Sequence, residues 1–386
     1  MIVVERRLDT VGGHYRSQLD AIRRFVEDRA VTFVAAREFQ AHGADMAEEV
    51  IPLLSSYKEI KKCPNAALDH DVAAFAQIVA DRSFDRSDAV LIPTAEHPDI
   101  RLCLQLAAQG PHPKRFYLRV LLERTIAGLS DDERKQLRQA VASGRIVLLA
   151  ETITMSAHLS ALYDMRFSQT VLCLPCAVKS IPVAATKMAS RAPAQRYRIG
   201  IMGSLRPEKG ALMVPKIIRH LRRSLSDLPA SPQIDLIFQK ARPRLKIKDI
   251  RREYRFRRDA GGLARTGNLA ICPLPVAMSD NDFVTTLFSV DILLLPYRLV
   301  DYRHRGSGIV LDAVAARKPI VHTAGMGMTE LLTLGNAEAA AEDPADYADK
   351  LLKVLADLDS YAAGADRAAC ELRRQYKASA DLLRSM

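Results

Sequence analysis

Residues 291–323 read DILLLPYRLVDYRHRGSGIVLDAVAARKPIVHT, and this stretch predicts in turn a strand, a loop, a helix and a second strand. The short apolar run at 291–296 suits a strand that is buried in a parallel sheet. Apolar side chains over 310–314 then recur at helical spacing behind a helix start at Ser307. The run at 320–321 begins the next strand. A strand, a helix and a further strand in this order are typical of a parallel α/β sheet.

The start of this predicted helix suits a phosphate group. Ser307 and Gly308 would present free backbone N–H groups at the positive end of the helix dipole, where anions bind. The preceding loop, residues 297–306, carries three arginines and one histidine. Asp312 lies one turn further along the helix, within reach of hydroxyl groups on a ligand held at the helix start.

The stretch resembles the nucleotide-sugar motif of GT-B glycosyltransferases, in particular the retaining enzymes of family 4. That motif is an acidic residue, seven further residues, and then a glutamate followed by Ala-x-Ala-x-Gly-x-Pro. Residues 312–319 match its second half, with Asp312 in place of the glutamate and Arg317 in place of the glycine. His304 stands where the family has the first acidic residue. The resemblance implies that this half of the chain binds a nucleoside-diphosphate sugar.

A second match to the same family lies at residues 203–210, which read GSLRPEKG and follow a predicted strand at 198–202. Family 4 enzymes have a glycine, a short loop, an arginine and Lys-Gly at this point. The resemblance implies that Arg206 and Lys209 hold the donor diphosphate and neutralise the charge that develops on it as it leaves. An arginine can contact phosphate through two N–H groups, whereas a lysine acts as a point charge. An exposed basic loop is the alternative interpretation.

The resemblance also implies a wider set of donor contacts. In the family, the loop that follows the strand predicted here at 269–273 binds the nucleotide base through its backbone. The donor-binding residues expected beside Arg206 and Lys209 are Gly203, Pro275, Val276, His304, Gly306, Ser307, Gly308 and Asp312.

The length of 386 residues suits two domains, and strands alternate with helices in both halves. We expect an N-terminal Rossmann-like acceptor domain over 1–178, a linker over 179–196 and a C-terminal nucleotide-sugar-binding domain over 197–362. A charged helix over 363–386 is expected to return to the first domain, as it often does in GT-B proteins. The expected fold class is therefore α/β, a GT-B fold with two Rossmann-like domains facing across a cleft.

Several local patterns lead to further expectations. Residues 48–56 and 209–221 are expected to be helical, and residues 171–178 to form a strand. A helix is expected from Pro344, because proline favours the first helical position and Asp343 can cap it.

The acceptor is expected to bind in the N-terminal domain. A Gly-Gly turn after the first strand would let the backbone approach a ligand closely. Other polar residues follow predicted strands, at the edge where open α/β sheets place ligands. A purely structural role is the alternative for each of them. The candidates are Gly12, Gly13, His14, His97, Arg119 and Glu151.

The composition argues against several classes of protein. No apolar run is long enough to span a membrane, and the charged residues at 5–7 make the start unlike a signal peptide. Cys173 and Cys176 have the spacing of a redox or zinc motif, but their apolar surroundings and the lack of a second pair favour a structural role. We expect a reduced, cytoplasmic setting, no metal site, and no cofactor beyond the nucleoside-diphosphate sugar as co-substrate.

The formal net charge of +11 predicts an anionic partner. Lysine and arginine crowd over residues 240–265, where Tyr254 and Phe256 lie between the charges. A solvated surface is one interpretation of this segment. Binding to an anionic membrane, on the inner face of the cell membrane, is another. Nucleic acid is disfavoured because no nucleic-acid-binding motif accompanies the run.

The predicted function is a metal-independent glycosyltransferase of the hexosyltransferase type. It would move a sugar from a nucleoside-diphosphate sugar to a glycan, lipid-linked or other hydroxyl acceptor, in polysaccharide or glycoconjugate assembly. The resemblance implies retention at the sugar carbon. Two alternatives stay open. One is a non-catalytic nucleotide-sugar or glycan-binding protein, which His304 and Arg317 favour. The other is a different GT-B enzyme class, such as a phosphorylase or a sugar-nucleotide epimerase, and for the epimerase His304 could supply a group near the sugar.

Overall fold

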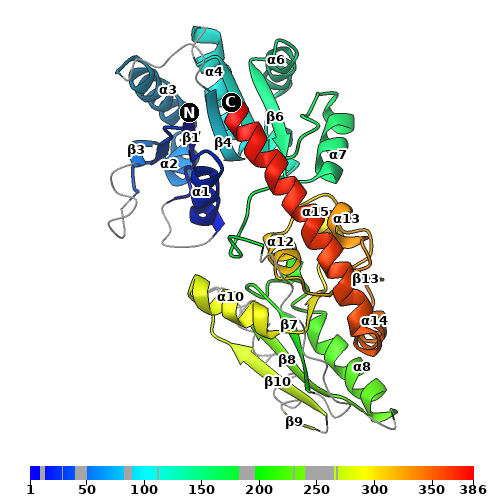
Figure 1. Ribbon diagram of the computed structural model, residues 1–386. Coiled ribbons are helices and arrows are strands. Elements are labelled where there is room, and N and C mark those ends of the chain that lie inside the picture. Colours follow the sequence, from blue (N-terminus) through cyan, green and yellow to red (C-terminus); the bar gives the residue numbers. More distant parts are fainter. Residues whose placement is uncertain are drawn as a thin grey trace. The chain divides into compact units, whose positions relative to one another are not determined.

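The structure is a computed structural model of the 386-residue chain (Figure 1). It describes residues 1–8, 14–27, 29–39, 50–81, 89–110, 113–181, 196–228, 231–239, 265–266 and 268–386.

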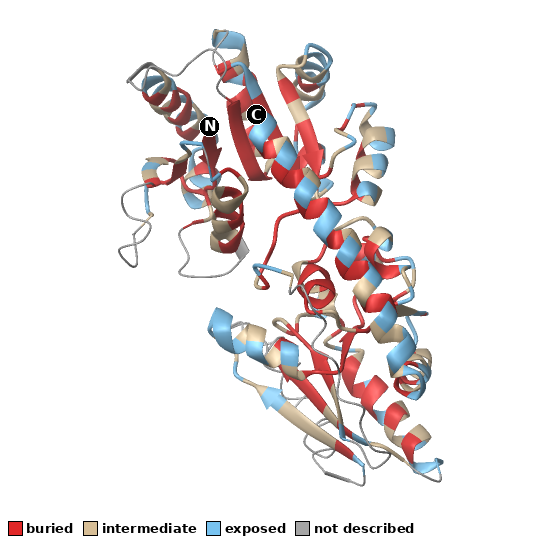
Figure 2. Cartoon of the chain, in the orientation of Figure 1, coloured by how far each residue is buried: buried red, intermediate tan, exposed pale blue. Residues whose placement is uncertain are grey.

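The chain divides into two compact units. Unit 1 consists of Met1–Pro175 and Gln375–Met386, and unit 2 is Cys176–Arg374. The last helix, α15 (Leu358–Ser385), therefore begins in unit 2 and ends in unit 1. In both units the strands are mostly buried, whereas the helices have a buried and an exposed side (Figure 2).

Unit 1 is built around a parallel sheet. Within the described residues this sheet has six strands, in the order β3-β2-β1-β4-β5-β6. The apolar side chains alternate between its two faces: Ile2 and Val4 of the first strand belong to one core, and Val3 belongs to the other. The strand bounds are β1 (Ile2–Val4), β2 (Thr32–Ala36), β3 (Val50–Leu54), β4 (Ala89–Ala95), β5 (Arg115–Val120) and β6 (Ile146–Ala150).

Helices cover both faces of this sheet because each face is apolar. Helices α3 to α7 contribute side chains to the core that contains Ile2, whereas α1 and the end of α15 contribute to the core that contains Val3. The helix bounds are α1 (His14–Phe25), α2 (Tyr57–Lys62), α3 (Pro64–Asp81), α4 (His97–Gln109), α5 (Arg124–Ala127), α6 (Asp131–Ala142) and α7 (Ile153–Tyr163).

Unit 2 has a second, similar sheet. Its described strands lie in the order β13-β12-β11-β7-β8-β10-β9, and all pair in parallel except β9, which runs antiparallel to β10 at the edge. The bounds are β7 (Arg196–Ile201), β8 (Gln233–Gln239), β9 (Arg265–Thr266), β10 (Leu269–Leu274), β11 (Ile292–Leu295), β12 (Ile320–Thr323) and β13 (Ala337–Ala340).

The helices of unit 2 include the two whose starts the sequence indicated. Helix α12 begins at Gly308 behind Ser307, and Asp343 caps α14 by accepting hydrogen bonds from the N–H groups of Ala345 and Asp346, as predicted. The bounds are η1 (Pro207–Lys209), α8 (Val214–Ser226), α10 (Asp280–Ser289), α11 (Leu299–Tyr302), α12 (Gly308–Ala315), α13 (Thr329–Leu332) and α14 (Pro344–Ala356).

The expected helix at 48–56 is wrong. Residues Val50–Leu54 form strand β3, which pairs in parallel with β2. Pro52 is tolerated because β3 lies at the edge of the sheet among the described strands, and edge strands are where proline is found in sheets. The apolar run is too short for its periodicity to separate strand from helix.

Two other expectations also need correction. Residues 171–178 form no strand; the N–H of Leu172 bonds to Ala150 O, but that of Cys173 bonds to the Ser379 hydroxyl instead of a neighbouring strand. The helix expected at 209–221 begins only at Val214, because the short turn η1 precedes it.

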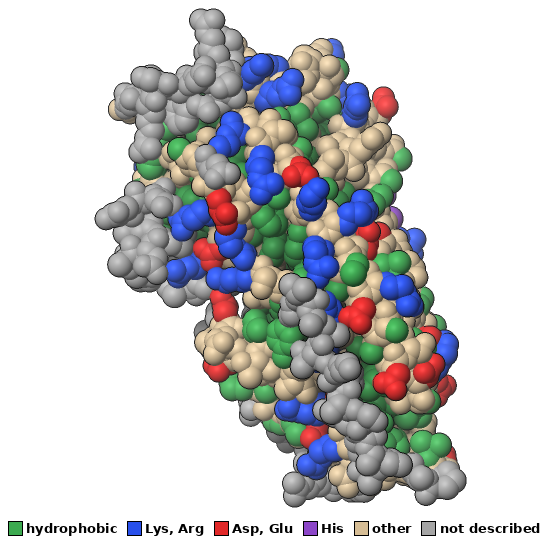
Figure 3. All heavy atoms as spheres, viewed as in Figure 1, with side chains coloured by type: hydrophobic (Ala, Val, Ile, Leu, Met, Phe, Trp, Pro, Cys, Tyr) green, Lys and Arg blue, Asp and Glu red, His purple; other side chains and the backbone are tan. Residues whose placement is uncertain are grey.

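None of the described helices is both long enough and apolar enough to cross a bilayer. Most of the basic segment 240–265 and most of the linker 179–196 lie outside the described residues. On the face seen in Figure 3, lysine and arginine side chains are spread among acidic ones.

Candidate functional site

Both sequence motifs of unit 2 lie at the carboxyl ends of its two central strands. Strand β7, the first of the unit, lies between β8 and β11, so the strand order reverses there. Ligands of open α/β sheets bind at such a reversal point, beyond the carboxyl ends of the strands. Residues 203–210 follow β7, and the loop that leads to α12 follows β11.

Two glycines bring the loop after β7 against the end of β11. Gly203 has a positive φ of 77°, and a Cβ there would lie 2.9 Å from Lys209 Nζ. Gly210 also has a positive φ, 80°, and a Cβ there would collide with the carbonyl oxygen of Pro296. Only glycine satisfies both conditions without strain, which gives a physical reason for the glycine on either side of the arginine and lysine.

The ammonium group of Lys209 lies 5.6 Å from the centre of the Tyr297 ring. Burial, together with the positive charges of Arg206 and Arg305, lowers the pKa of Lys209 to about 8, although Glu208 and Asp312 act in the opposite direction. No described carboxylate forms an ion pair with it. Lys209 is therefore a cation in positive surroundings, which favours the binding of an anion.

Arg206 reaches the same region from the residue before η1. Its Nε lies 3.1 Å from a carboxylate oxygen of Glu208, and its side chain is 40% exposed. The backbone carbonyl of Glu208 accepts a hydrogen bond from the N–H of Arg298, which ties this turn to the loop after β11. The Arg206 side chain is thus positioned by Glu208 and still accessible to a ligand.

The start of α12 offers backbone donors beside these cations. The N–H groups of Gly308 and Ile309 have no acceptor among the described residues. The N–H of Ser307 is directed at the sulfur of Met328, 3.1 Å away, which is a weak acceptor. Two free N–H groups at the positive end of a helix suit a phosphate oxygen.

Asp312 also lies on α12, and its carboxylate is bonded to the backbone of the segment that precedes β7. It is buried, and its Oδ1 accepts a 2.8 Å hydrogen bond from the N–H of Val178. Burial raises its pKa to about 7, while hydrogen bonds from the N–H groups of Val178 and Ala177 act in the opposite direction. Its expected contact with ribose hydroxyls therefore stays a prediction, since at least one oxygen is already engaged.

The segment that enters unit 2 also packs on the first turn of α12. A Cβ on Gly308 would lie 2.8 Å from Cys176 Sγ, so glycine is needed there to accommodate the thiol. Together with the bond from Val178 to Asp312, this contact seats residues 176–178 along α12. None of the six cysteines, which all lie among the described residues, forms a disulfide, and Cys173 and Cys176 are buried.

The loop between β11 and α12 contains a cation that the sequence analysis did not single out. Arg305 lies with its guanidinium 5.1 Å from the centre of the Tyr302 ring. The neighbouring His304 is half-buried. The only sequence signal for Arg305 was the run Arg303-His304-Arg305, which does not show which of the two arginines packs against the aromatic ring of Tyr302.

The loop after β10, where the resemblance implies base binding, is tied to the neighbouring strand β8. The amide Nε2 of Gln239, at the end of β8, donates to the carbonyl oxygen of Val276 at 3.2 Å. Pro275, beside Val276, is exposed. Gly306, the expected donor contact in the loop before α12, is buried. The carboxyl ends of β8 and β10 are thereby joined.

Arg317 occupies a backbone conformation that usually favours glycine. Its φ is 55°, in the left-handed region, at the end of α12. The N–H of Lys318 bonds to Ala313 O and that of Arg317 to Val314 O, which is a Schellman cap. The Arg317 guanidinium pairs with Asp366 at 2.9 Å. The glycine that the family 4 motif has at this position would adopt the left-handed conformation without strain.

The acceptor candidates of unit 1 are only partly described. Gly12 and Gly13 lie outside the described residues, and His14 begins α1 with its side chain outside them. The fully buried Arg119 donates to Glu151 at 3.1 Å and to Pro93 O at 3.2 Å, so the structure brings these two candidates together. His97 begins α4, and its pKa is lowered by burial and by Arg101.

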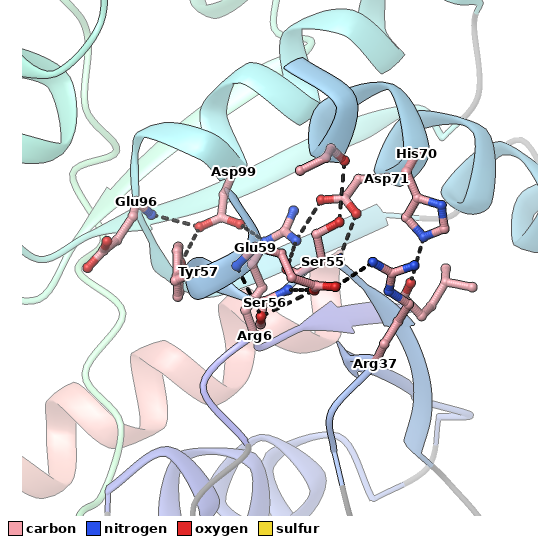
Figure 4. A network of polar contacts seen from close by, with 12 residues as sticks. Arg6, Arg37, Ser55, Ser56, Tyr57, Glu59, His70, Asp71, Glu96 and Asp99 are labelled. Carbon is pink, nitrogen blue, oxygen red and sulfur yellow. Dashed lines mark hydrogen bonds and ion pairs between the residues drawn. The ribbon is translucent and has the colours of Figure 1, made fainter. Parts of the chain in front are cut away.

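A buried polar network in unit 1 was missed by the sequence analysis (Figure 4). Arg6 follows β1 and donates to Asp99 at 2.6 Å, to Asp71 at 2.7 Å and to Ser55 O at 2.7 Å. The Tyr57 hydroxyl donates to the other oxygen of Asp99 at 2.8 Å. Arg6 has carboxylate partners on both α3 and α4, so the network ties these helices to the end of β1. The only sequence signal was the charged run at 5–7, directly after an apolar strand.

Arg7 lies beside this network and nearer the surface. Its guanidinium pairs with Glu96, donates to the Tyr15 hydroxyl at 2.7 Å and lies over the Tyr57 ring at 5.1 Å. Glu5 is buried, and burial raises its pKa to about 7.

Among the described residues, no group of three or more His, Cys, Asp or Glu side chains is arranged to hold a metal ion.

Comparison with known proteins bears on the fold. No family model and no curated protein matches the chain. Sucrose-phosphate synthase from Thermosynechococcus elongatus superposes with a TM-score of 0.67 at 12% identity, over 97% of this chain and 94% of that one. A glycosyltransferase from Rickettsia africae ESF-5 gives a TM-score of 0.68 at 12% identity, over 99% and 94%. Anabaena HepE, in complex with UDP and glucose, gives 0.61 at 13% identity, over 99% and 96%.

The chain has the GT-B fold. The predicted fold class is thereby confirmed. The narrower resemblance to family 4 still depends on residues 203–210 and 304–319.

Proposed function

We propose that the chain is a glycosyltransferase that transfers a sugar from a nucleoside-diphosphate sugar to a hydroxyl group of an acceptor. The observation that carries this proposal is that Lys209, in the same loop as Arg206, and Ile309, at the start of α12, both lie against Gly203, at the strand-order reversal of unit 2. As the glycosidic bond to the donor breaks, negative charge develops on the departing diphosphate. Cations and N–H groups that are already in place stabilise that charge, and each such contact is typically worth roughly 10²–10³ in rate.

The structural neighbours support this proposal, since HepE is described in complex with UDP and glucose. The match of residues 312–319 to the family 4 motif favours a retaining enzyme of that type. We further propose that Arg206 and Lys209 take the role that a divalent cation has in other transferases, so that the reaction needs no metal. We also propose that the protein is cytoplasmic. Its basic composition favours action at an anionic membrane, on a glycan or lipid-linked acceptor.

A thermal-shift screen tests the donor site. UDP, GDP, ADP and CDP are added separately to the wild type, to Arg206→Ala and to Lys209→Ala. A ligand that binds only the folded state raises the midpoint as its concentration exceeds its dissociation constant. We expect one diphosphate to stabilise the wild type and neither variant. Lys216→Ala, an exposed lysine on α8, is the matched control and should respond as the wild type does. An equal shift in all four proteins would contradict the proposal.

A non-catalytic nucleotide-sugar-binding protein is the second candidate. The hydrogen bond that engages Asp312 with Val178, and His304 in place of the first acidic residue, favour it. Hydrolysis of the bound sugar nucleotide distinguishes the two functions. A transferase without acceptor should release nucleoside diphosphate slowly, and this release should fall in Lys209→Ala. A protein that binds the donor but releases none at all would support the second candidate.

A further inference from the structure

Two cations and two aromatic rings form a continuous stack at the carboxyl end of β11. Lys209 Nζ lies 5.6 Å from the centre of the Tyr297 ring. The Tyr297 and Tyr302 ring centres are 4.4 Å apart with a tilt of 38°. Arg305 lies 5.1 Å from the centre of the Tyr302 ring. Both rings are almost fully buried, so they form a rigid aromatic layer with one cation packed against each ring.

The charges around this stack are not balanced. The positive charges of Arg206 and Arg305 both act on Lys209 and help to lower its pKa. Among the described residues, the one carboxylate paired with any of them is Glu208, which is bound to Arg206. The nearby Asp301, in the first turn of α11, pairs with Arg298 at 3.4 Å.

The remaining acidic neighbour does not restore the balance. Asp312 directs Oδ1 at the backbone N–H of Val178. Even with Glu208 and Asp312 both ionised, the three cations leave an excess of positive charge, which an anion would compensate.

Arg305 is held in this position by its own backbone. The N–H of Gly327 donates to Tyr302 O at 2.9 Å. A Cβ on Gly327 would lie 3.0 Å from Arg305 O and 3.2 Å from the carbonyl carbon of His304. The loop therefore packs directly on a glycine of the segment after β12. This packing reduces the entropy that Arg305 would lose on binding a ligand.

We propose that Arg305 is a third cation that contacts the diphosphate of the donor, acting with Arg206 and Lys209. This inference rests on the function proposed above. The aromatic layer would orient the guanidinium, and its planar set of N–H groups can contact phosphate oxygens through two hydrogen bonds. The bound ligand would then be a diphosphate in preference to a monophosphate or a nucleoside.

Calorimetric titration with UDP, and in parallel with inorganic pyrophosphate, tests this assignment in the full chain. Arg305→Gln should weaken binding of both probes about 10- to 100-fold, as expected for the loss of a charge-assisted contact. Its effect on UMP should be several-fold smaller. Arg305→Lys keeps the charge but loses the paired geometry, so it should bind with intermediate affinity.

Arg303→Gln is the matched control, because Arg303 is an exposed arginine of the same loop. It should bind UDP within about twofold of the wild type, and circular dichroism should show all three variants to be folded. UDP binding that Lys209→Ala abolishes but Arg305→Gln leaves unchanged would overturn this assignment and leave the proposed function intact. Pyrophosphate binding that depends on Arg305, with no binding of any nucleotide, would instead contradict the proposed function alone. If neither pyrophosphate nor any of the four nucleoside diphosphates binds, both are wrong.

Discussion

The buried carboxyl group of Asp312 should make the stability of the chain depend on pH. Its pKa is raised from 3.8 to about 7 in the folded state. Between these two values the folded chain binds a proton that the unfolded chain lacks, so the free energy of unfolding falls as the pH rises. The difference of about 3 units corresponds to about 4 kcal/mol when the pH exceeds both values.

Asp312→Asn removes this titration and keeps an oxygen that can accept the hydrogen bond from Val178. At low pH the variant should be less stable than the wild type by about 1 kcal/mol, because one hydrogen bond is weakened. As the pH rises, the wild type alone acquires the buried charge. Between ~pH 5 and ~pH 8 the variant should therefore gain about 2–3 kcal/mol relative to the wild type.

Urea unfolding followed by far-UV circular dichroism is the assay, since the chain contains no tryptophan. The quantity to plot is the difference in unfolding free energy between variant and wild type at each pH. Asp312→Ala also lacks the titrating group, so its plot should have the same slope with a lower offset. Plots that stay flat for both variants from ~pH 5 to ~pH 8 would refute the reasoning, because the linkage would then be absent.

Two further variants test the structural interpretation by urea unfolding. Arg6→Ala should lower the free energy of unfolding by about 3–5 kcal/mol, because it leaves two buried aspartates without their cation. The control Arg37→Ala breaks an exposed ion pair and should lower it by less than about 1 kcal/mol. Equal losses in the two variants would show that Arg6 does not stabilise the buried network in this way. Arg317→Gly should leave stability within about 1 kcal/mol of the wild type or raise it, since relief of the left-handed backbone offsets the lost ion pair with Asp366. A loss of more than about 2 kcal/mol would mean that the contacts of the Arg317 side chain contribute more than a surface ion pair normally does.

Much of unit 2 could be predicted because its signals are local. The strand, loop, helix and strand of residues 291–323 are encoded by apolar spacing and by a helix start, which act over a few residues. Residues 203–210 likewise contain their two required glycines and both cations in one short segment. The fold class followed from repetition of such units along the chain.

The element at 48–56 shows where local reasoning fails. A short apolar run such as Val50–Leu54 is compatible with either a strand or a helix, and pairing with β2 decided the outcome. Residues 171–178 are apolar too, but the N–H of Cys173 bonds to the hydroxyl of Ser379, about 200 residues further along the chain, and not to a strand.

The amino-acid sequence by itself determined which segments become strands and helices over most of the chain, and that Arg206, Lys209 and the start of α12 would meet at strand ends. Only the tertiary structure decided which partners the polar side chains have. Asp312 was placed correctly one turn into its helix, yet it faces Val178, which is 134 residues away in sequence. Arg6 donates a hydrogen bond to Asp99, which is 93 residues away in sequence. Helical and strand periodicity depends on neighbours along the chain, whereas a hydrogen bond or ion pair depends on which distant segments packing brings within about 3 Å.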